Sequence, residues 1–172
     1  MFILARGYER MPADRSSTLY KVKGAHGRLL RIWYNRHMIK DCQVGVKGIV
    51  CTEDGCLVLK SENGYWDIPG GRIGGEETIE ETLHRELKEE LPSIGGYKFG
   101  NIVHAFRLSK NIIDGKGLVL LFYKVEAEKF DVALSSEHQG YRWVTKDTLH
   151  ELRNADIPIE SGYYEAIRRV LE

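Results

Sequence analysis

The stretch from residue 70 to residue 92 most constrains the fold, because a glycine-rich turn runs directly into a strongly acidic amphipathic helix. Thr78 and Glu81 have the spacing of a capping box, in which each side chain bonds the backbone amide of the other residue. Apolar residues then recur every four positions, at Ile79, Leu83, Leu87 and Leu91. Pro92 ends the pattern, because proline has no amide hydrogen to continue the helix. The pattern predicts a helix between Thr78 and Pro92 whose apolar stripe lies on a sheet.

Three glutamates, Glu86, Glu89 and Glu90, lie on one flank of this stripe, within about a third of the helix circumference. Like charges at this spacing destabilise a helix by roughly 0.2–0.5 kcal/mol per pair. A divalent cation would remove the repulsion, and Mg²⁺ takes oxygen ligands from carboxylates, water and substrate phosphate. The alternative is the solvated face of an ordinary glutamate-rich helix. From these residues alone, both interpretations remain open.

The spacing of the charged residues resembles the Nudix box, G-x5-E-x7-R-E-U-x-E-E-x-G-U, in which U is aliphatic. Gly71 is followed after five residues by Glu77, and after seven more by Arg85-Glu86-Leu87-Lys88-Glu89-Glu90. Pro92 and Ser93 replace the glycine and the aliphatic residue that end the box, which we interpret as an altered end of the helix. The chain is therefore identified as a member of the Nudix hydrolase family.

The resemblance implies hydrolysis of a phosphoanhydride bond in a nucleoside diphosphate derivative, with Mg²⁺ or Mn²⁺ bound at the box. The ligands that it implies are the Gly71 carbonyl and the carboxylates of Glu86, Glu89 and Glu90. One of these carboxylates, Glu86 or Glu89, would also orient or deprotonate the attacking water. Glu77 and Arg85 match box positions that pair with each other in the family, so their expected role is structural.

Other residues are weaker candidates for the site. Residues 137–143 resemble the E-H-x-x-x-x-W segment of the family, which makes Glu137 a candidate additional metal ligand or base. The alternative for Glu137 is an exposed loop glutamate, and His138 is expected to form hydrogen bonds in the loop rather than to catalyse. Lys60 and Arg72 are candidate contacts to substrate phosphate, although each is equally well explained as a surface charge.

Strands and helices are predicted on both sides of the acidic helix. Strands are expected at residues 18–23, 28–34, 44–52, 56–60, 65–68, 97–108, 118–127 and 141–144. Glu53-Asp54-Gly55 supplies a hairpin turn, a short helix follows at 147–153, and Ser161 opens a last helix with Ile167, Val170 and Leu171 inward. This order predicts an α/β fold with a mixed β-sheet and helices on both faces. The resemblance implies a Nudix-like α/β/α sandwich over residues 41–172.

Residues 1–40 precede the predicted Nudix hydrolase domain as a basic N-terminal extension. They hold nine Lys and Arg residues against Glu9 and Asp14. The two strands expected here form a β-hairpin, whose basic character is typical of a solvated cover on a sheet edge. The alternatives are a clamp for substrate phosphates and a contact in a homodimer.

Composition limits the class of protein. Hydrophobic residues make up 42% of the chain and charged residues 29%, as in globular domains, and the formal net charge is zero, which argues against general binding to nucleic acid or a membrane. No apolar run approaches the ~18 residues of a membrane span. Three cysteines without C-x-x-C spacing, and no secretory signal, predict reduced thiols in a cytoplasmic protein.

The substrate is expected to be a small nucleoside diphosphate derivative, and nucleoside triphosphates and nucleotide sugars lead the candidates. The segments that the family associates with ADP-ribose, diadenosine polyphosphates, NADH and coenzyme A are not recognised in this sequence. Two other functions stay open. One is a nucleotide-binding regulator that does not hydrolyse its ligand. The other is a different reaction on the same fold, such as RNA 5′-pyrophosphohydrolysis or, with Cys51 or Cys56 as catalyst, isoprenoid-diphosphate isomerisation.

Overall fold

The computed structural model describes residues 9–10, 17–23, 29–35, 41–113 and 116–172. The chain divides into two compact units, Met1–Asp41 and Cys42–Glu172. In the first unit, β1 (Glu9–Arg10), β2 (Ser17–Lys23) and β3 (Leu29–Asn35) form an antiparallel sheet in that order. The pairing of β2 with β3 confirms the predicted hairpin strands, whereas β1 was not predicted. The residues expected to form the hairpin turn, 24–27, lie outside the described residues.

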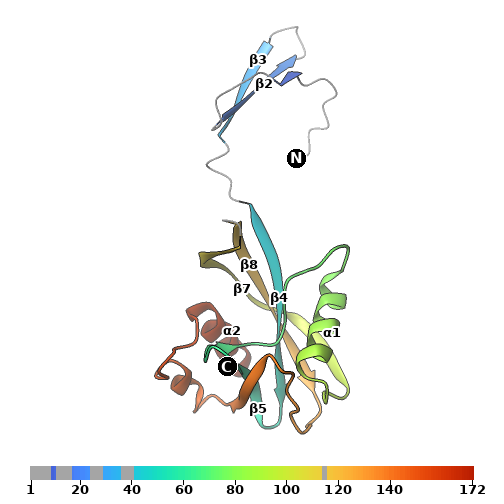
Figure 1. Ribbon diagram of the computed structural model, residues 1–172, viewed down its shortest axis with the longest axis vertical. Helices are drawn as coiled ribbons and strands as arrows, with labels where there is room; N and C mark the ends of the chain where they lie inside the picture. Colours follow the sequence, from blue (N-terminus) through green and yellow to red (C-terminus); the bar gives the residue numbers. More distant parts are fainter. Residues whose placement is uncertain (1–8, 11–16, 24–28, 36–40, 114–115) are drawn as a thin grey trace. The chain divides into compact units, whose positions relative to one another are not determined.

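The second unit is built on one mixed sheet (Figure 1). Its strands are β4 (Cys42–Thr52), β5 (Gly55–Ser61), β6 (Trp66–Asp67), β7 (Tyr97–Ile113), β8 (Lys116–Ala127) and β9 (His138–Val144). They lie in the order β6-β5-β4-β8-β7, and β9 pairs with β5. The central pair, β4 with β8, is parallel, and the other pairs are antiparallel.

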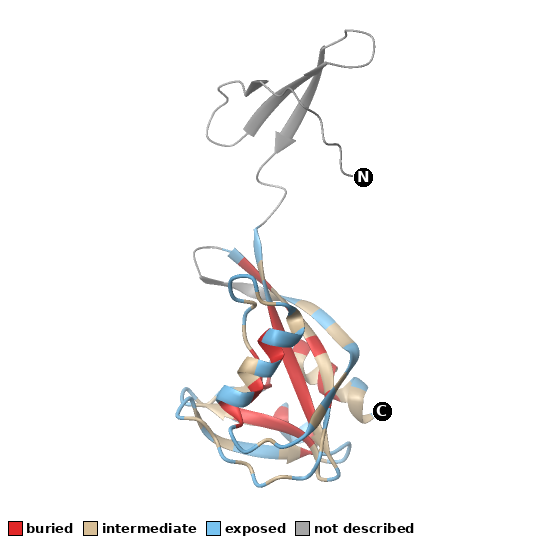
Figure 2. Cartoon of the chain, turned by 90° about the vertical axis from the view of Figure 1, so that its right-hand side faces the viewer, coloured by how far each residue is buried: buried red, intermediate tan, exposed pale blue. Residues whose placement is uncertain are grey.

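Two helices cover opposite faces of this sheet, α1 (Ile79–Glu90) on one side of β4 and α2 (Ser161–Leu171) on the other (Figure 1). Side chains alternate along β4, so Val50 packs with the α1 side and Ile49 with the α2 side. Buried residues follow the central strands, and the outer face of α1 is exposed (Figure 2). This arrangement confirms the predicted α/β/α sandwich with a mixed sheet.

Helix α1 begins and ends as the sequence predicts. The hydroxyl oxygen of Thr78 accepts from the backbone N–H of Glu81 at 3.2 Å, and the Glu81 carboxylate accepts from the Thr78 backbone N–H at 2.8 Å. Of the apolar stripe, Leu83, Leu87 and Leu91 are fully buried and Ile79 is half-buried. After the helix, the Ser93 hydroxyl accepts a hydrogen bond from the Ala133 backbone N–H at 2.9 Å.

The C-terminal part differs in detail from the prediction. The short helix after β9 is a 3-10 helix, η1 (Leu149–Leu152), rather than a helix over 147–153. In α2, Ile167 is fully buried, as expected, and Val170 and Leu171 are half-buried and pack against the same hydrophobic cluster. In the described part of the chain, no helix has the length and apolar character needed to cross a membrane.

Candidate active site

A turn at Gly70-Gly71 is fixed along β4 by backbone hydrogen bonds. The N–H of Gly48 donates to the Pro69 carbonyl at 2.8 Å, and the N–H of Val46 donates to the Gly71 carbonyl at 2.8 Å. Gly70 has φ of +129°, and a Cβ there would overlap the Val46 carbonyl. Only glycine fits this conformation and this close approach to the strand. The turn therefore has one defined position on the sheet.

The Glu86 carboxylate lies against Gly71. A Cβ on Gly71 would overlap this carboxylate, so the absence of a side chain lets α1 place it beside the turn. The Glu86 side chain is only 14% exposed. The Gly71 carbonyl oxygen accepts one hydrogen bond, from Val46, and has a second lone pair. A carbonyl oxygen and a carboxylate are thus brought together at one point.

Glu90 reaches the same turn from the next turn of α1. Its Oε2 accepts a hydrogen bond from the Gly70 N–H at 3.2 Å, and the residue is 8% exposed. Burial raises the pKa of the Glu90 carboxyl from its ordinary value to about 8. The charge of Lys47 opposes this rise, whereas the charges of Asp67 and Glu86 add to it. A cation at the turn would favour the ionised form of Glu90.

Glu89, the third glutamate of the predicted set, is held differently. Its side chain is 60% exposed, and its Oε2 lies 3.3 Å from Nη1 of Arg85. The same Nη1 donates to Glu86 at 2.7 Å. Arg85 also forms the expected ion pair with Glu77, at 2.7 Å and 3.0 Å, and these hydrogen bonds lower the pKa of Glu77 to about 2. The guanidinium of Arg85 therefore lies among three carboxylates of the box.

The structure thus brings Glu86 and Glu90 to the Gly70-Gly71 turn and turns Glu89 toward Arg85. Within the described residues, no three His, Cys, Asp or Glu side chains are grouped closely enough to hold a metal ion. The oxygen donors at the turn are instead of two kinds, a backbone carbonyl and carboxylates. Oxygen donors of both kinds fit a hard cation such as Mg²⁺, which also keeps several water ligands.

The other predicted site residues lie around this turn in different ways. Glu137 is exposed in the loop that precedes β9, and this loop contacts the end of α1 through a hydrogen bond from the Ser135 N–H to the Glu90 carbonyl at 3.3 Å. Lys60 Nζ lies 5.7 Å from the centre of the Trp66 ring. Arg72 is exposed and its backbone forms an isolated bridge with β4.

His138 opens β9, directly after the loop that carries Glu137. Its Nδ1 is buried without a hydrogen-bond partner among the described residues, and burial lowers the pKa of its imidazole. The charges of Asp67 and Glu137 oppose this lowering, whereas the charge of Lys47 adds to it. The expected role of His138 as a hydrogen-bonding residue of the loop stays a prediction for its ring, and its backbone N–H donates to the Ser135 carbonyl at 3.4 Å.

The sequence interpretation missed an ion pair below the turn, in which the lysine is buried and the aspartate is 36% exposed. Lys47 Nζ lies 2.9 Å from Asp67 Oδ1 and donates to the Gly70 carbonyl at 2.7 Å. Burial alone would lower the pKa of Lys47, but its interaction with Asp67, followed by those with Tyr163 and Glu90, outweighs burial and raises this pKa. Gly70 is thus held by two hydrogen bonds, one from Lys47 to its carbonyl and one from its N–H to Glu90. A lysine inside the apolar run from residue 46 to residue 50 was the available signal.

Comparisons with known proteins agree with the fold. Residues 42–169 match the family model of the NUDIX domain. The chain is 27% identical over 136 residues to the putative 8-oxo-dGTP diphosphatase 2 of Mycobacterium tuberculosis, which covers 75% of this chain and 90% of that protein. It is 29% identical over 144 residues to the nucleoside triphosphatase NudI of Salmonella newport, with coverage of 72% and 96%. The structure of a MutT protein from Methanosarcina mazei is similar, with a TM-score of 0.61 at 22% identity, over 76% of this chain and 93% of that chain.

The ion pair between Lys47 and Asp67 predicts a coupled effect on stability. Lys47→Met should lower the free energy of unfolding by about 1–3 kcal/mol, because it leaves the Gly70 carbonyl without its donor and the partly exposed Asp67 without its cation. The double variant Lys47→Met/Asp67→Leu should lose less stability than the sum of the losses measured for Lys47→Met and for Asp67→Leu. Urea unfolding of the four proteins measures the coupling, with the exposed Lys88→Met as a matched control. Additive losses would contradict it.

The raised pKa of Glu90 predicts a pH dependence in metal-free protein. Between about pH 4.5 and pH 8 the unfolded chain has released this proton and the folded protein has kept it, so the free energy of unfolding falls as pH rises. The slope from this one group is at most about 1.4 kcal/mol per pH unit. Glu90→Gln should remove that slope in urea unfolding with a chelator present. If the free energy of unfolding changes with pH by the same amount in both proteins, Glu90 does not have a raised pKa in the folded state.

Proposed function

The chain belongs to the Nudix family of hydrolases, and we propose that it is a divalent-metal-dependent pyrophosphohydrolase that cleaves a phosphoanhydride bond in a nucleoside di- or triphosphate derivative by attack of water. The observation that carries this proposal is the meeting of Glu86 and Glu90 at the Gly70-Gly71 turn. Glu90 is buried, and burial raises its pKa to about 8, so the ionised form is disfavoured there unless a cation is bound beside it.

The residues that would hold Mg²⁺ or Mn²⁺ are the Gly71 carbonyl, Glu86 and Glu90, joined by Glu89 when its side chain leaves Arg85. When bound, the ion neutralises charge on the phosphate oxygens and makes its bound water more acidic. Glu86 already interacts with Arg85 at 2.7 Å, so its carboxylate is held in one orientation before any ligand arrives. Preorganised charge of this kind costs no rearrangement during the reaction.

The base that acts on the attacking water is proposed among the same side chains. Glu86 or Glu89 orients the water or removes its proton, since both side chains are more exposed than that of Glu90. Glu137 is proposed as an additional ligand or base, because its loop is tied to the end of α1 and its charge acts on His138 beside Asp67. Lys60 and Arg72 are proposed to contact the phosphates of the substrate.

Nucleoside triphosphates are the proposed substrates, with nucleotide sugars second. The two curated relatives described above are named for triphosphate substrates, an oxidised deoxyguanosine triphosphate and nucleoside triphosphates. Both cover more than 70% of this chain, including the entire box. The charge of the triphosphate also suits a site whose cation is held by several carboxylates.

A panel assay tests this function. Full-length protein with Mg²⁺ is given nucleoside triphosphates, 8-oxo-dGTP, nucleotide sugars and a 5′-triphosphorylated RNA, and the products are separated by ion-exchange chromatography. Release of a nucleoside monophosphate and pyrophosphate from a triphosphate supports the proposal. Cleavage of the RNA alone would replace it with the RNA 5′-pyrophosphohydrolase. Binding of a nucleotide without cleavage of any substrate would replace it with a regulator.

Substitutions in the box test the site separately from the substrate. Glu89→Gln and Glu90→Gln should each lower kcat by at least about 100-fold, because each removes a charge directed at the cation, with little loss of stability. Glu80→Gln, at an exposed position in the first turn of the same helix, is the matched control and should keep its rate. A normal rate in both box variants would remove these residues from the site.

A further inference from the structure

Cys51 and Cys56 face each other across the β4–β5 hairpin. They are direct partners in the register of the two strands, and their Sγ atoms lie 2.8 Å apart. Direct partners in antiparallel strands have Cα atoms about 4.5–5.5 Å apart, within the range that a disulfide spans. We propose that this pair is an oxidation site, at which a low-molecular-weight disulfide converts the two thiols into an intrachain disulfide. This proposal does not depend on the hydrolase chemistry.

The backbone around the pair needs little adjustment. The S–S bond is about 2.05 Å long, so the two sulfurs have less than about 1 Å to close. Both cysteines lie within paired strands: Cys51 also pairs with Glu126 of β8, and Cys56 also pairs with Val144 of β9. The hairpin turn between them is set by Gly55, whose φ of +122° favours glycine. The strands therefore hold the thiols in register whether they are reduced or oxidised.

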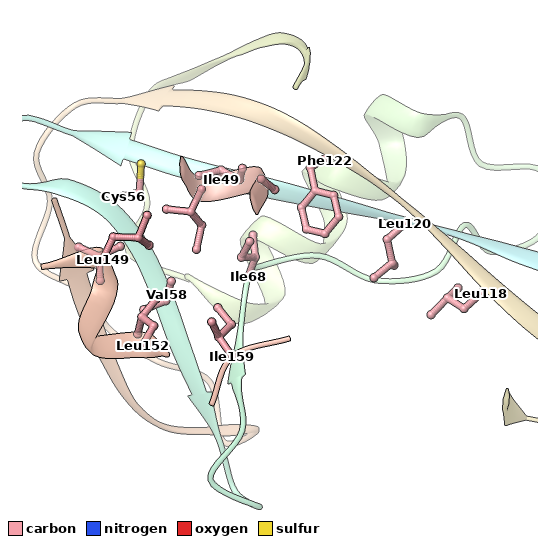
Figure 3. Close-up of a cluster of buried hydrophobic side chains, with 13 residues drawn as sticks. Ile49, Cys56, Val58, Ile68, Leu118, Leu120, Phe122, Leu149, Leu152 and Ile159 are labelled. Atoms are coloured by element: carbon pink, nitrogen blue, oxygen red, sulfur yellow. The ribbon is translucent and has the colours of Figure 1, made fainter. Parts of the chain in front are cut away.

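The two thiols differ in their access to solvent. Cys56 is 1% exposed and packs in the core on the α2 side, close to Ile49 and Leu149 (Figure 3). Cys51 is half-buried, and its neighbour across the β4–β8 ladder is the exposed Glu126. A reagent from solution therefore meets Cys51 first, and Cys56 is the thiol that completes the reaction.

The local charges favour the same order of events. The hydrogen bond between the two sulfurs, followed by burial, raises the pKa of Cys56, so Cys56 is not the thiol that a reagent in solution meets as a thiolate. The ammonium of Lys124, which also pairs with Glu126 at 2.7 Å, interacts with both sulfurs. A nearby cation stabilises a thiolate, which is the form that attacks disulfides.

The reaction has two steps. The Cys51 thiolate attacks one sulfur of the small disulfide, breaks its S–S bond and releases one thiolate, which leaves a mixed disulfide at Cys51. The Cys56 sulfur, losing its proton to solvent, then attacks Cys51 and releases the second thiolate. The two protein thiols lose two electrons and two protons, and one molecule of the small disulfide is reduced to two thiols.

Oxidation with glutathione disulfide tests the proposal in a full-length Cys42→Ser background, which leaves only this pair of cysteines. After equilibration over a series of glutathione to glutathione disulfide ratios, the remaining thiols are alkylated and the intact mass is measured. We expect alkylatable thiols to fall from two to none, with loss of two hydrogens, no glutathione adduct and a monomer on a non-reducing gel. Two thiols that remain alkylatable at every ratio, a stable glutathione adduct or cross-linked dimers would each overturn the proposal.

Two single variants separate the roles of the sulfurs. With Cys56→Ser, the reaction should stop at a glutathione adduct on Cys51, because the second thiol is missing. With Cys51→Ser, the buried Cys56 should stay unmodified. An adduct on Cys56 but not on Cys51 would reverse the assigned order and contradict the access argument. The measurement on the Cys42→Ser protein stands by itself if either single variant fails to fold.

Discussion

The attachment of a side-chain-free turn to the central strand β4 is the constraint on which the rest of the candidate site depends. Because Gly48 and Val46 donate backbone hydrogen bonds to Pro69 and Gly71, the turn is part of the sheet rather than a loop above it. Helix α1 packs on the same sheet through Leu83 and Leu87, so the helix and the turn share one support. The distance between a box carboxylate and the Gly71 carbonyl is thus set by core packing.

Placing glutamates beside the turn has an electrostatic cost, which nearby cationic side chains partly offset. Glu90 is buried beside the turn, and burial opposes its ionisation. Lys47 lies below the same peptide, paired with Asp67, and supplies a fixed positive charge that partly compensates. Arg85 has the corresponding role on the exposed side, where it contacts Glu77, Glu86 and Glu89. In the proposed enzyme, a bound cation adds the positive charge that Lys47 and Arg85 supply only in part.

Local sequence signals predicted the parts of the fold that depend on near neighbours. The capping box of Thr78, the stripe that contains Leu83 and the hairpin at Gly55 each follow from contacts within a few residues, and the structure contains all three. The different burial and contacts of Glu86, Glu89 and Glu90 could not be predicted, because they depend on where the turn meets the helix.

Longer-range pairs were also beyond the sequence pattern. Lys47 and Asp67 are twenty residues apart, and only the sheet brings them together. The predicted hairpin places Cys51 opposite Cys56, yet the contact between their sulfurs depends on side-chain packing against the α2 side of the core. Sequence spacing therefore indicates the family and the ligand types, whereas the geometry of charges and thiols comes from tertiary packing.

The most direct test of the central claim is diffraction from crystals soaked in Mn²⁺, with the ion located by its anomalous signal. The account predicts an anomalous peak about 2.0–2.3 Å from the Gly71 carbonyl oxygen and from carboxylate oxygens of Glu86 and Glu90. Such a peak would show that the turn and α1 together form a cation site. An ion bound elsewhere, or Glu90 still hydrogen-bonded to Gly70 with no ion beside it at saturating Mn²⁺, would contradict the account.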